Sequence, residues 1–223
     1  CGVLWMASGD DPYTDATRAT LQGAQLPVDV LDGHALRARY PHLAAADVHT
    51  ALLEPDCGVL MARRAVQALV DELAHRDVRW IRGRVAEPAT SGSVEAVRLA
   101  DGRELRADVF VFACGAWLPK VFPRALGGVI RPTRQVVVFF GTPAGDDRFG
   151  PSSTPAWVDF PAGIYGVPDL ERRGMKVGID AHGPSFDPDS DDRVADHESI
   201  ARARDWVARR FPAMADAPVV ALL

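Results

Sequence analysis

Residues 107–114 read Ala-Asp-Val-Phe-Val-Phe-Ala-Cys and run directly into the small-residue turn Gly115-Ala116-Trp117. A continuous apolar run of this length is typical of a strand that is buried on both faces, as in a parallel sheet between two layers. α/β folds bind ligands at the carboxyl ends of such strands, where a small residue lets a ligand approach the backbone. The turn is therefore either a ligand-binding loop or a tight strand-to-helix connection with Trp117 packed in the core.

The segments around this run predict one α/β unit over residues 57–118. Apolar residues recur with helical spacing over 62–75, and a strand-like run follows over 78–85. A hairpin is predicted over 94–105, because Asp101-Gly102 is a strong turn signal between two short β-prone runs.

The flanking segments, 1–56 and 119–223, are richer in short β-prone runs, and an amphipathic helix is predicted over 198–211. Two β-rich regions that enclose an α/β unit indicate two domains that share the chain discontinuously, in the α/β (α+β) class. Both ends of the sequence read as parts of strands, so we expect a piece of a longer chain.

Composition excludes several classes of protein. The 223 residues include 25 basic and 30 acidic side chains, a net charge of −5, and 48% are hydrophobic. These values exclude a disordered chain and a collagen-like repeat, and they argue against a nucleic-acid partner, which would select a basic face. Three widely spaced cysteines form no metal-ligand or disulfide pattern and favour a reducing compartment, the cytoplasm. No apolar run is long enough for a membrane span, and no metal site is expected.

Three residues in the β-rich regions are candidates for function. Lys176 lies among apolar and small residues of a predicted strand, and it is one of only two lysines among the 25 basic residues. An ammonium is a compact charge whose pKa can be tuned, unlike that of arginine, although an edge-strand lysine is the ordinary explanation. Tyr165, between two glycines, is either a core tyrosine or a pocket-lining group. Arg134 precedes a strand, and a salt bridge is its default role.

Seven segments, taken in order, resemble the amine-oxidising flavoproteins of the glycine oxidase/D-amino-acid oxidase superfamily, and most of all the sarcosine oxidase and N-methyltryptophan oxidase type. They are residues 54–60, 101–102 with 107–108, 113–117, 131–135, 163–168, 175–178 and 182–183. Each motif is short, and it is their collinear order over nearly the whole chain that makes the resemblance specific.

The resemblance implies an FAD-binding α/β domain interleaved with a substrate domain on a mixed β-sheet. Residues 1–56 and 119–223 would then form the two parts of the substrate domain, and residues 57–118 the middle part of the FAD-binding domain. The implied cofactor-binding positions are Val85, Ala113, Gly115, Ala116, Trp117 and Arg134. Val85 would contact the adenosine part of FAD through its backbone, and the turn at 115–117 would close over the cofactor.

The resemblance also implies roles for three residues near the reacting atoms. Lys176 matches a lysine that lies over the flavin ring and promotes the reaction of reduced flavin with oxygen, which makes it the implied catalytic residue. Tyr165 matches a tyrosine that lines the substrate pocket. Asp180 stands where sarcosine oxidases usually carry a histidine, so a carboxylate is expected beside the substrate.

The implied activity is oxidation of the C–N bond of a secondary amine or amino acid by hydride transfer to FAD, with oxygen as the electron acceptor. The family's glycine-rich dinucleotide motif does not occur in this sequence, so we expect the chain by itself to bind FAD poorly and to be inactive. Two other hypotheses stay open: a cofactor-free binding domain that retains the oxidase architecture, and a flavin dehydrogenase that passes electrons to a protein acceptor.

Overall fold

The structure, a computed structural model, describes residues 1–9, 11–88 and 93–223. The chain divides into two compact units, each assembled from separated segments. Unit 1 comprises residues 1–60, 135–181 and 193–223, and unit 2 comprises residues 61–134 and 182–192. Which unit binds flavin and which binds substrate stays a prediction.

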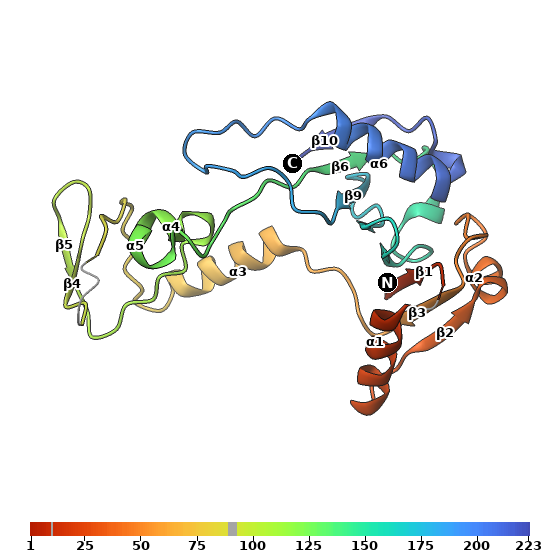
Figure 1. Cartoon of the computed structure of the whole chain (residues 1–223), viewed down its shortest axis with the longest axis horizontal. Helices are drawn as coiled ribbons and strands as arrows, with labels where there is room; N and C mark the ends of the chain where they lie inside the picture. Colours follow the sequence, from red (N-terminus) through yellow and green to blue (C-terminus); the bar gives the residue numbers. More distant parts are fainter. Residues whose placement is uncertain (10, 89–92) are drawn as a thin grey trace. The chain divides into compact units, whose positions relative to one another are not determined.

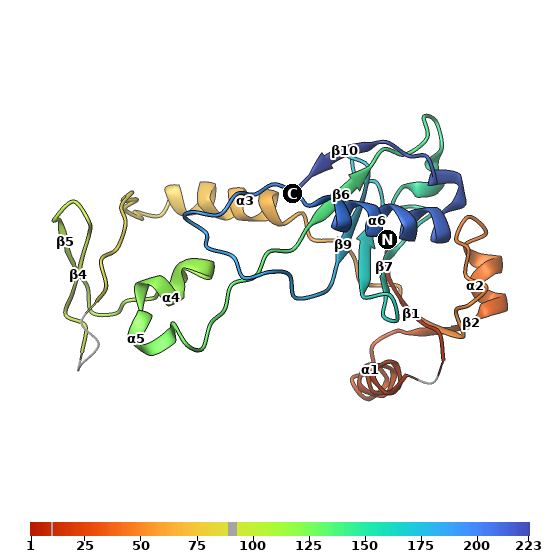
Figure 2. The same cartoon turned by 45° about the horizontal axis from the view of Figure 1, so that its top comes forward.

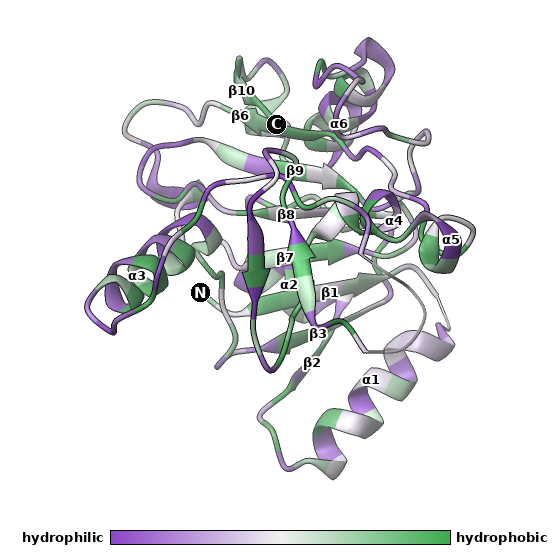
Figure 3. Cartoon of the chain, turned by 90° about the vertical axis from the view of Figure 1, so that its left-hand side faces the viewer, coloured by the Kyte–Doolittle hydropathy of each residue, from purple (hydrophilic) through white to green (hydrophobic). Residues whose placement is uncertain are grey.

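Unit 1 is built on an eight-stranded mixed sheet (Figure 1). Across the sheet, the order is β10 (Val219–Leu222), β6 (Val137–Phe140), β9 (Met175–Ile179), β8 (Ile164–Val167), β7 (Ala156–Asp159), β1 (Val3–Ala7), β3 (Thr50–Glu54) and β2 (Asp29–Asp32). Figure 3 shows the run from β9 to β2 in this order. The central β1–β7 pair is parallel and all other neighbouring strands are antiparallel. A mixed sheet combined with helices confirms the predicted mixed α/β class.

The strands of unit 1 have two faces because successive side chains point to opposite sides. Leu4 and Met6 of β1 are buried, whereas the intervening Trp5 is only partly buried. We call the side that carries Leu4, Met6 and their buried cross-strand neighbours the core face, and the other side the second face. The same alternation on β7 and β9 places Trp157 and Val177 on the core face.

Helix α6 (His197–Arg210) packs on the core face of unit 1 (Figure 2). Its Ala203, Trp206 and Val207 are buried, and the Trp206 ring stacks on Trp157 with the ring centroids 3.9 Å apart. The other helices of unit 1 are α1 (Pro12–Gly23) and α2 (Gly33–Arg39), with short 3₁₀ turns at η2 (Asp147–Phe149) and η3 (Pro212–Met214). Asp32 caps α2 by accepting a hydrogen bond from the backbone N–H of Ala35 at 2.7 Å.

A buried ionic group fixes α6 to the sheet. Asp159 at the end of β7 is 1% exposed and accepts hydrogen bonds from Arg210 Nε at 2.9 Å and Trp206 Nε1 at 2.8 Å. The Arg210 guanidinium, which is 3% exposed, also forms an ion pair with Asp47 and donates to the carbonyl of Ala44. Each buried charge therefore has an opposite charge and further hydrogen bonds, as a low-dielectric interior requires.

Unit 2 contains little regular sheet. It consists of α3 (Ala62–Ala74), the hairpin β4 (Ala96–Arg98) and β5 (Glu104–Arg106), the 3₁₀ turn η1 (Gly115–Trp117), and two short helices, α4 (Leu118–Val121) and α5 (Pro123–Leu126). The hairpin and α3 confirm two of the sequence predictions. No residue of α3 is buried, although its apolar side chains repeat with helical spacing.

The prediction of strands over residues 78–85 and 107–114, on either side of this hairpin, is wrong. Residues 107–114 form no ladder in the described part of unit 2, and residues 78–85 make only one isolated bridge, between Val85 and Leu99. Val109 is 76% exposed and Val111 is 85% exposed, so the run is not buried on both faces. The physical reason is that a strand exists only through pairing, and no described segment of unit 2 lies alongside this run to pair with it. Hydrophobicity alone cannot supply that partner.

Candidate functional site

The predicted catalytic and substrate residues come together on the second face of the unit 1 sheet. In the β8–β9 register, Tyr165 lies opposite Gly178 and Val167 lies opposite Lys176. Tyr165 and Lys176 are therefore diagonal neighbours on one face. The Lys176 Nζ atom lies 5.3 Å from the centroid of the Tyr165 ring, within the range of a cation–π interaction.

Gly178 makes room for this pair. A Cβ atom added there would lie 2.4 Å from Cζ of Tyr165, closer than any real contact, so the tyrosine ring covers the glycine. Asp180 is two residues further along the chain than Gly178, is exposed, and donates its backbone N–H to the carbonyl of Gly163 at 2.8 Å. The structure thus brings Lys176 and Tyr165 into contact and places Asp180 just beyond the end of β9.

Burial controls the charge of both members of the pair. Burial lowers the pKa of Lys176, because desolvation penalises the ammonium form. Burial also raises the pKa of Tyr165, and the Asp180 carboxylate adds to that rise. Among the residues that the structure describes, Lys176 Nζ has no hydrogen bond or ion pair. The site therefore holds a half-buried cation, without a counterion, over a phenol that stays protonated.

A cavity of about 460 Å³ in unit 2 includes two of the predicted cofactor positions, Val85 and Trp117. The complete lining is Gly83, Arg84, Val85, Cys114, Trp117, Lys120, Val121 and Asp189. This volume lies in the range of sites for drug-sized molecules, so it fits one part of a dinucleotide.

Asp189 organises the polar side of this cavity. It accepts hydrogen bonds from Lys120 Nζ at 2.7 Å and Trp117 Nε1 at 3.0 Å, and it forms an ion pair with Arg84 at 2.8 Å. The Lys120 ammonium, followed by the Trp117 indole N–H, lowers the pKa of Asp189 to about 2. A carboxylate held in this way stays ionised near neutral pH and can accept further hydrogen bonds from a bound hydroxyl group.

The other predicted cofactor positions lie outside the lining. Gly115 has a φ of +51°, a left-handed conformation that favours glycine, and an added Cβ there would meet no atom within 4 Å. Arg134 forms an ion pair with Asp192 at 3.4 Å, as the default explanation of its sequence position proposes. Ala113 and Ala116 flank Cys114 and Gly115 at the beginning of the turn.

Sequence reasoning missed Asp189 and Lys120. Lys120 lies against the acidic residues of segment 184–193, where it contacts Asp187 at 2.5 Å as well as Asp189. The rarity of lysine was the available signal, because Lys120 is the only lysine besides Lys176.

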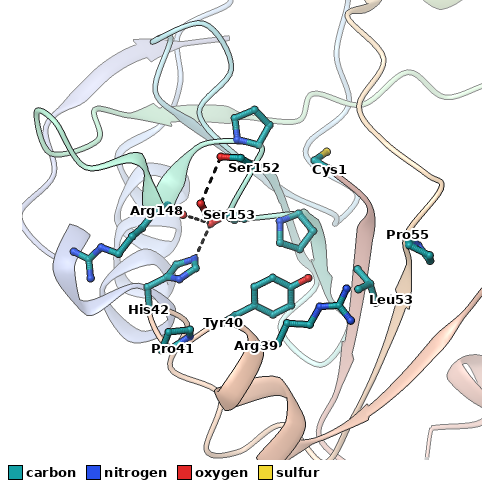
Figure 4. A pocket seen from close by; sticks show the side chains of 13 residues that line it. Cys1, Arg39, Tyr40, Pro41, His42, Leu53, Pro55, Arg148, Ser152 and Ser153 are labelled. Carbon is teal, nitrogen blue, oxygen red and sulfur yellow. Dashed lines mark hydrogen bonds between the residues drawn. The ribbon is translucent and has the colours of Figure 1, made fainter.

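A second cavity, of about 530 Å³, lies in unit 1 at the loop that precedes β7 (Figure 4). His42 Nε2 lies 2.7 Å from Thr154 Oγ1, and that hydroxyl donates its proton to the carbonyl of Arg148 at 2.6 Å. His42 Nε2 must therefore be the donor to Thr154. Burial, with a smaller contribution from Arg148, lowers the pKa of His42, so the imidazole is neutral at neutral pH.

The charges around this second cavity are paired within unit 1. Arg39 is paired with Asp29 at 2.8 Å, and Arg148 is paired with Asp146 at 2.6 Å. The residues of the lining are Cys1, Arg39, Tyr40, Pro41, His42, Leu53, Pro55, Arg148, Pro151, Ser152, Ser153, Thr154 and Pro155. Leu53 belongs to the core face, so this cavity and the Lys176–Tyr165 pair are on different faces of the sheet.

The described residues contain no group of three or more histidine, cysteine, aspartate or glutamate side chains arranged to hold a metal ion. Their helices include none with the length and apolarity that crossing a membrane requires.

The chain is similar in sequence to several amine-oxidising enzymes. It is 28% identical over 196 residues to the monomeric sarcosine oxidase of Bacillus sp. (strain B-0618), a match that covers 86% of this chain and 50% of that enzyme. It is 30% identical over 196 residues to the monomeric sarcosine oxidase of Streptomyces avermitilis, covering 84% and 50%. It is 27% identical over 195 residues to the N-methyl-L-tryptophan oxidase of Citrobacter koseri, covering 79% and 47%. The chain thus spans about half the length of these relatives.

Solved structures with the same fold include two oxidases. Glycine oxidase from Geobacillus kaustophilus superimposes with a TM-score of 0.75 at 20% identity, covering 99% of this chain and 57% of that one. A thermally stable mutant of fructosyl peptide oxidase superimposes with a TM-score of 0.78 at 19% identity, covering 100% and 59%.

The family model described as FAD dependent oxidoreductase matches residues 1–221, nearly the whole sequence. This match confirms the resemblance to the glycine oxidase/D-amino-acid oxidase superfamily that the seven collinear motifs carry. The chain belongs to the FAD-dependent oxidoreductase family.

Proposed function

We propose that this chain is the part of an FAD-dependent amine oxidase that carries the oxygen-activating lysine and the substrate-contacting face. The observation that supports the proposal most directly is Lys176, a half-buried ammonium 5.3 Å from the centroid of the Tyr165 ring. Within the described residues no carboxylate neutralises it. A structural lysine in a strand would ordinarily have a counterion or reach solvent.

When bound, FAD supplies the hydride acceptor for C–N oxidation and the electrons that reduce oxygen. Lys176 contributes a fixed positive charge close to where negative charge develops as oxygen is reduced. A preorganised charge in a partly desolvated site stabilises developing negative charge more strongly than water does, and it needs no reorganisation. Because burial lowers the pKa of Lys176, this charge is lost at a lower pH than that of an exposed lysine.

Tyr165 and Asp180 are the proposed substrate contacts. Because burial raises the pKa of Tyr165, its hydroxyl stays protonated and can donate a hydrogen bond to a substrate oxygen. Asp180 would accept a hydrogen bond from a substrate ammonium and would repel a substrate carboxylate on its side of the sheet. The proposed substrate class is therefore a secondary amine or amino acid that presents its ammonium toward Asp180.

The cofactor would be held by Val85, Ala113, Gly115, Ala116, Trp117 and Arg134, together with Asp189 of the unit 2 cavity. The fit supports a nucleoside-sized part of FAD, since Asp189 offers an ionised acceptor and Trp117 an aromatic wall. On this proposal, residues 57–118 belong to the flavin domain and residues 1–56 and 119–223 to the substrate domain. The free cysteines also support a reducing cytoplasm as the compartment.

The test replaces Lys176 with methionine in the FAD-loaded enzyme that contains this chain. Stopped-flow mixing of the reduced enzyme with oxygen should show reoxidation slowed by about 100-fold, the usual cost of removing one preorganised charge or donor. Anaerobic reduction by substrate should change much less. Lys176→Arg, which keeps the charge, should recover part of the reoxidation rate.

Two outcomes would contradict the assignment. Equal slowing of reduction and reoxidation would remove the proposed role in oxygen activation. Wild-type enzyme that reoxidises slowly in oxygen but rapidly with a protein electron acceptor would instead identify a dehydrogenase.

A further inference from the structure

Three aromatic side chains gather on unit 1 away from the Lys176–Tyr165 pair: Trp5 of β1, Tyr13 of α1, and Phe160 just after β7. The Trp5 and Phe160 ring centroids are 5.4 Å apart with an interplanar angle of 12°, so the rings stack. The Tyr13 and Phe160 centroids are 4.8 Å apart at 54°. We call these three residues the aromatic cluster. It opens to solvent at Tyr13, which is 56% exposed.

Glu54 fixes the orientation of the aromatic cluster. Its Oε1 accepts a hydrogen bond of 2.6 Å from Trp5 Nε1, and its Oε2 accepts one of 3.3 Å from the Cys57 thiol. The hydrogen bond to Glu54 raises the pKa of the Cys57 thiol, which therefore remains the donor. The N–H edge of the indole is thus occupied by a carboxylate, and the face of the indole that Phe160 does not cover is the one left for a ligand.

The charged side chains that hydrogen-bond directly to members of the aromatic cluster, in the part of unit 1 that the structure describes, are acidic. Besides Glu54, Asp11 accepts hydrogen bonds from the backbone N–H groups of Tyr13 and Thr14 at the start of α1. Among the described contacts of Trp5, Tyr13, Phe160 and Glu54 there is no basic side chain. Aromatic faces beside a carboxylate attract an organic cation and disfavour an anion.

The sheet register places the aromatic cluster on the same face as the Lys176–Tyr165 pair. Trp5 lies opposite Val158 in the parallel β1–β7 pair, and Val158 lies opposite Tyr165 in the β7–β8 pair. Trp5 and Tyr165 therefore project from the second face two strands apart. Two inter-strand spacings amount to about 10 Å, which one extended small molecule can span.

We propose that the aromatic cluster and Glu54 bind a second cationic group of the substrate, an alkylammonium about 10 Å from the part of the substrate that contacts Tyr165. This inference rests on the proposed amine-oxidase function and narrows its substrate class to amines with a distal ammonium. Trp5, Tyr13 and Phe160 supply the ring faces, and Glu54 supplies the negative charge. They determine specificity and take no part in the oxidation itself.

The binding test uses the full 223-residue chain without flavin, so it does not depend on turnover. The probes are choline and its neutral isostere 3,3-dimethyl-1-butanol. The readout is the fluorine NMR spectrum of protein labelled with 5-fluorotryptophan, in which Trp5→Phe assigns the Trp5 signal. Choline should shift the Trp5 signal with an affinity at least about tenfold higher than that of the isostere, as expected for a cation–π site.

Substitutions separate the contributions of the Trp5 ring and the Glu54 carboxylate to choline binding. Isothermal titration calorimetry measures the variants, because those at Trp5 lack the fluorine reporter. Trp5→Leu and Glu54→Gln should each weaken choline binding by about tenfold, and Trp5→Phe should weaken it less because a ring remains. Trp80→Leu is the matched control: Trp80 is 58% exposed, belongs to unit 2, and should leave choline binding unchanged. Circular dichroism should show that the Trp5→Phe and Glu54→Gln proteins retain the wild-type fold.

Equal affinity for choline and the isostere would reduce the aromatic cluster to a simple apolar patch and overturn the inference. So would choline binding that Trp5→Leu and Glu54→Gln both leave intact. In the flavin-loaded enzyme, Trp5→Leu should raise KM for a diamine substrate while kcat changes little. Failure of the Lys176→Met test with intact choline binding would refute the oxidase proposal and leave the cation site standing.

Discussion

Units 1 and 2 carry similar apolar side chains and bury them to very different extents. In unit 1 the large residues Phe140, Trp157 and Trp206 are almost completely buried between the sheet and α6. In unit 2 Leu69 of α3 is 62% exposed and Val111 is exposed further still. The difference lies in pairing, because unit 1 combines eight hydrogen-bonded strands whereas the described part of unit 2 has one hairpin. Apolar periodicity therefore indicates which residues can be buried, and the available partners decide which residues are.

The largest expected effect is on stability and would test this contrast directly. Phe140→Ala should lower the free energy of unfolding of the chain by about 3–5 kcal/mol, because it leaves a cavity in the core of unit 1. Val111→Ala should change that free energy by less than about 0.5 kcal/mol. Urea denaturation followed by circular dichroism and tryptophan fluorescence measures both. Comparable losses for the two variants would show that residues 107–114 are buried in solution.

Substitutions of glycine should show the same difference between the packing of unit 1 and unit 2, with smaller changes in stability. A Cβ at Gly166 would lie 1.9 Å from Cζ2 of Trp157, so Gly166→Ala should destabilise unit 1 by about 1–3 kcal/mol through overpacking. Gly128 of unit 2 has open space around the position of an added Cβ, and Gly128→Ala should be neutral or slightly stabilising. Thermal melts of the two variants give the ranking, and the reverse order would contradict the close Gly166–Trp157 packing.

The smallest expected effect is a difference in pKa between the two lysines, and it concerns single side chains. Hydrogen bonds to Asp187 and Asp189 raise the pKa of Lys120, whereas burial lowers the pKa of Lys176. Because the chain contains only these two lysines, carbon-13 labelling of the lysine ε-carbon should give two resonances, with Lys176 titrating at the lower pH. Assignment uses Lys120→Met and Lys176→Met. A single shared titration would contradict the difference in environment.

The directions of these two pKa shifts determine whether each lysine stabilises or destabilises the folded chain. The folded-state pKa of Lys120 is above its unfolded value, so its contribution is complete below the unfolded pKa and is lost as the pH rises through the folded pKa. The folded-state pKa of Lys176 is below its unfolded value, so its ammonium destabilises the fold at neutral pH, and this cost falls as the pH rises. Lys176→Met should therefore stabilise the chain at pH 7, and Lys120→Met should destabilise it.

Much of unit 1 could be predicted because its signals are local. The strand around Lys176 and the helix that became α6 were each indicated by residue patterns within a few positions. The strand over 107–114 could not be judged in this way, since its hydrogen-bonding partner must come from elsewhere in the chain.

For the candidate site too, single positions could be predicted from the sequence, but contacts between distant residues could not. The resemblance indicated Lys176, Tyr165, Val85 and Trp117 as separate positions, and the structure puts the first two in contact and the last two on one cavity wall. Contacts between distant residues, such as Lys120 with Asp189 or Trp5 with Phe160, could not be read from the sequence.

The parallel pairing of β1 with β7 also determines the order of events during synthesis. Val3 pairs with Ala156, and all of unit 2 except residues 182–192 lies between them in the chain. A ribosome therefore releases β1, β2 and β3 long before β7 exists, and the edge of β1 must wait unpaired. Contacts of such long sequence separation slow folding and leave strand edges open to aggregation. The unpaired edge of β1 is thus exposed to wrong partners for as long as the ribosome takes to reach β7.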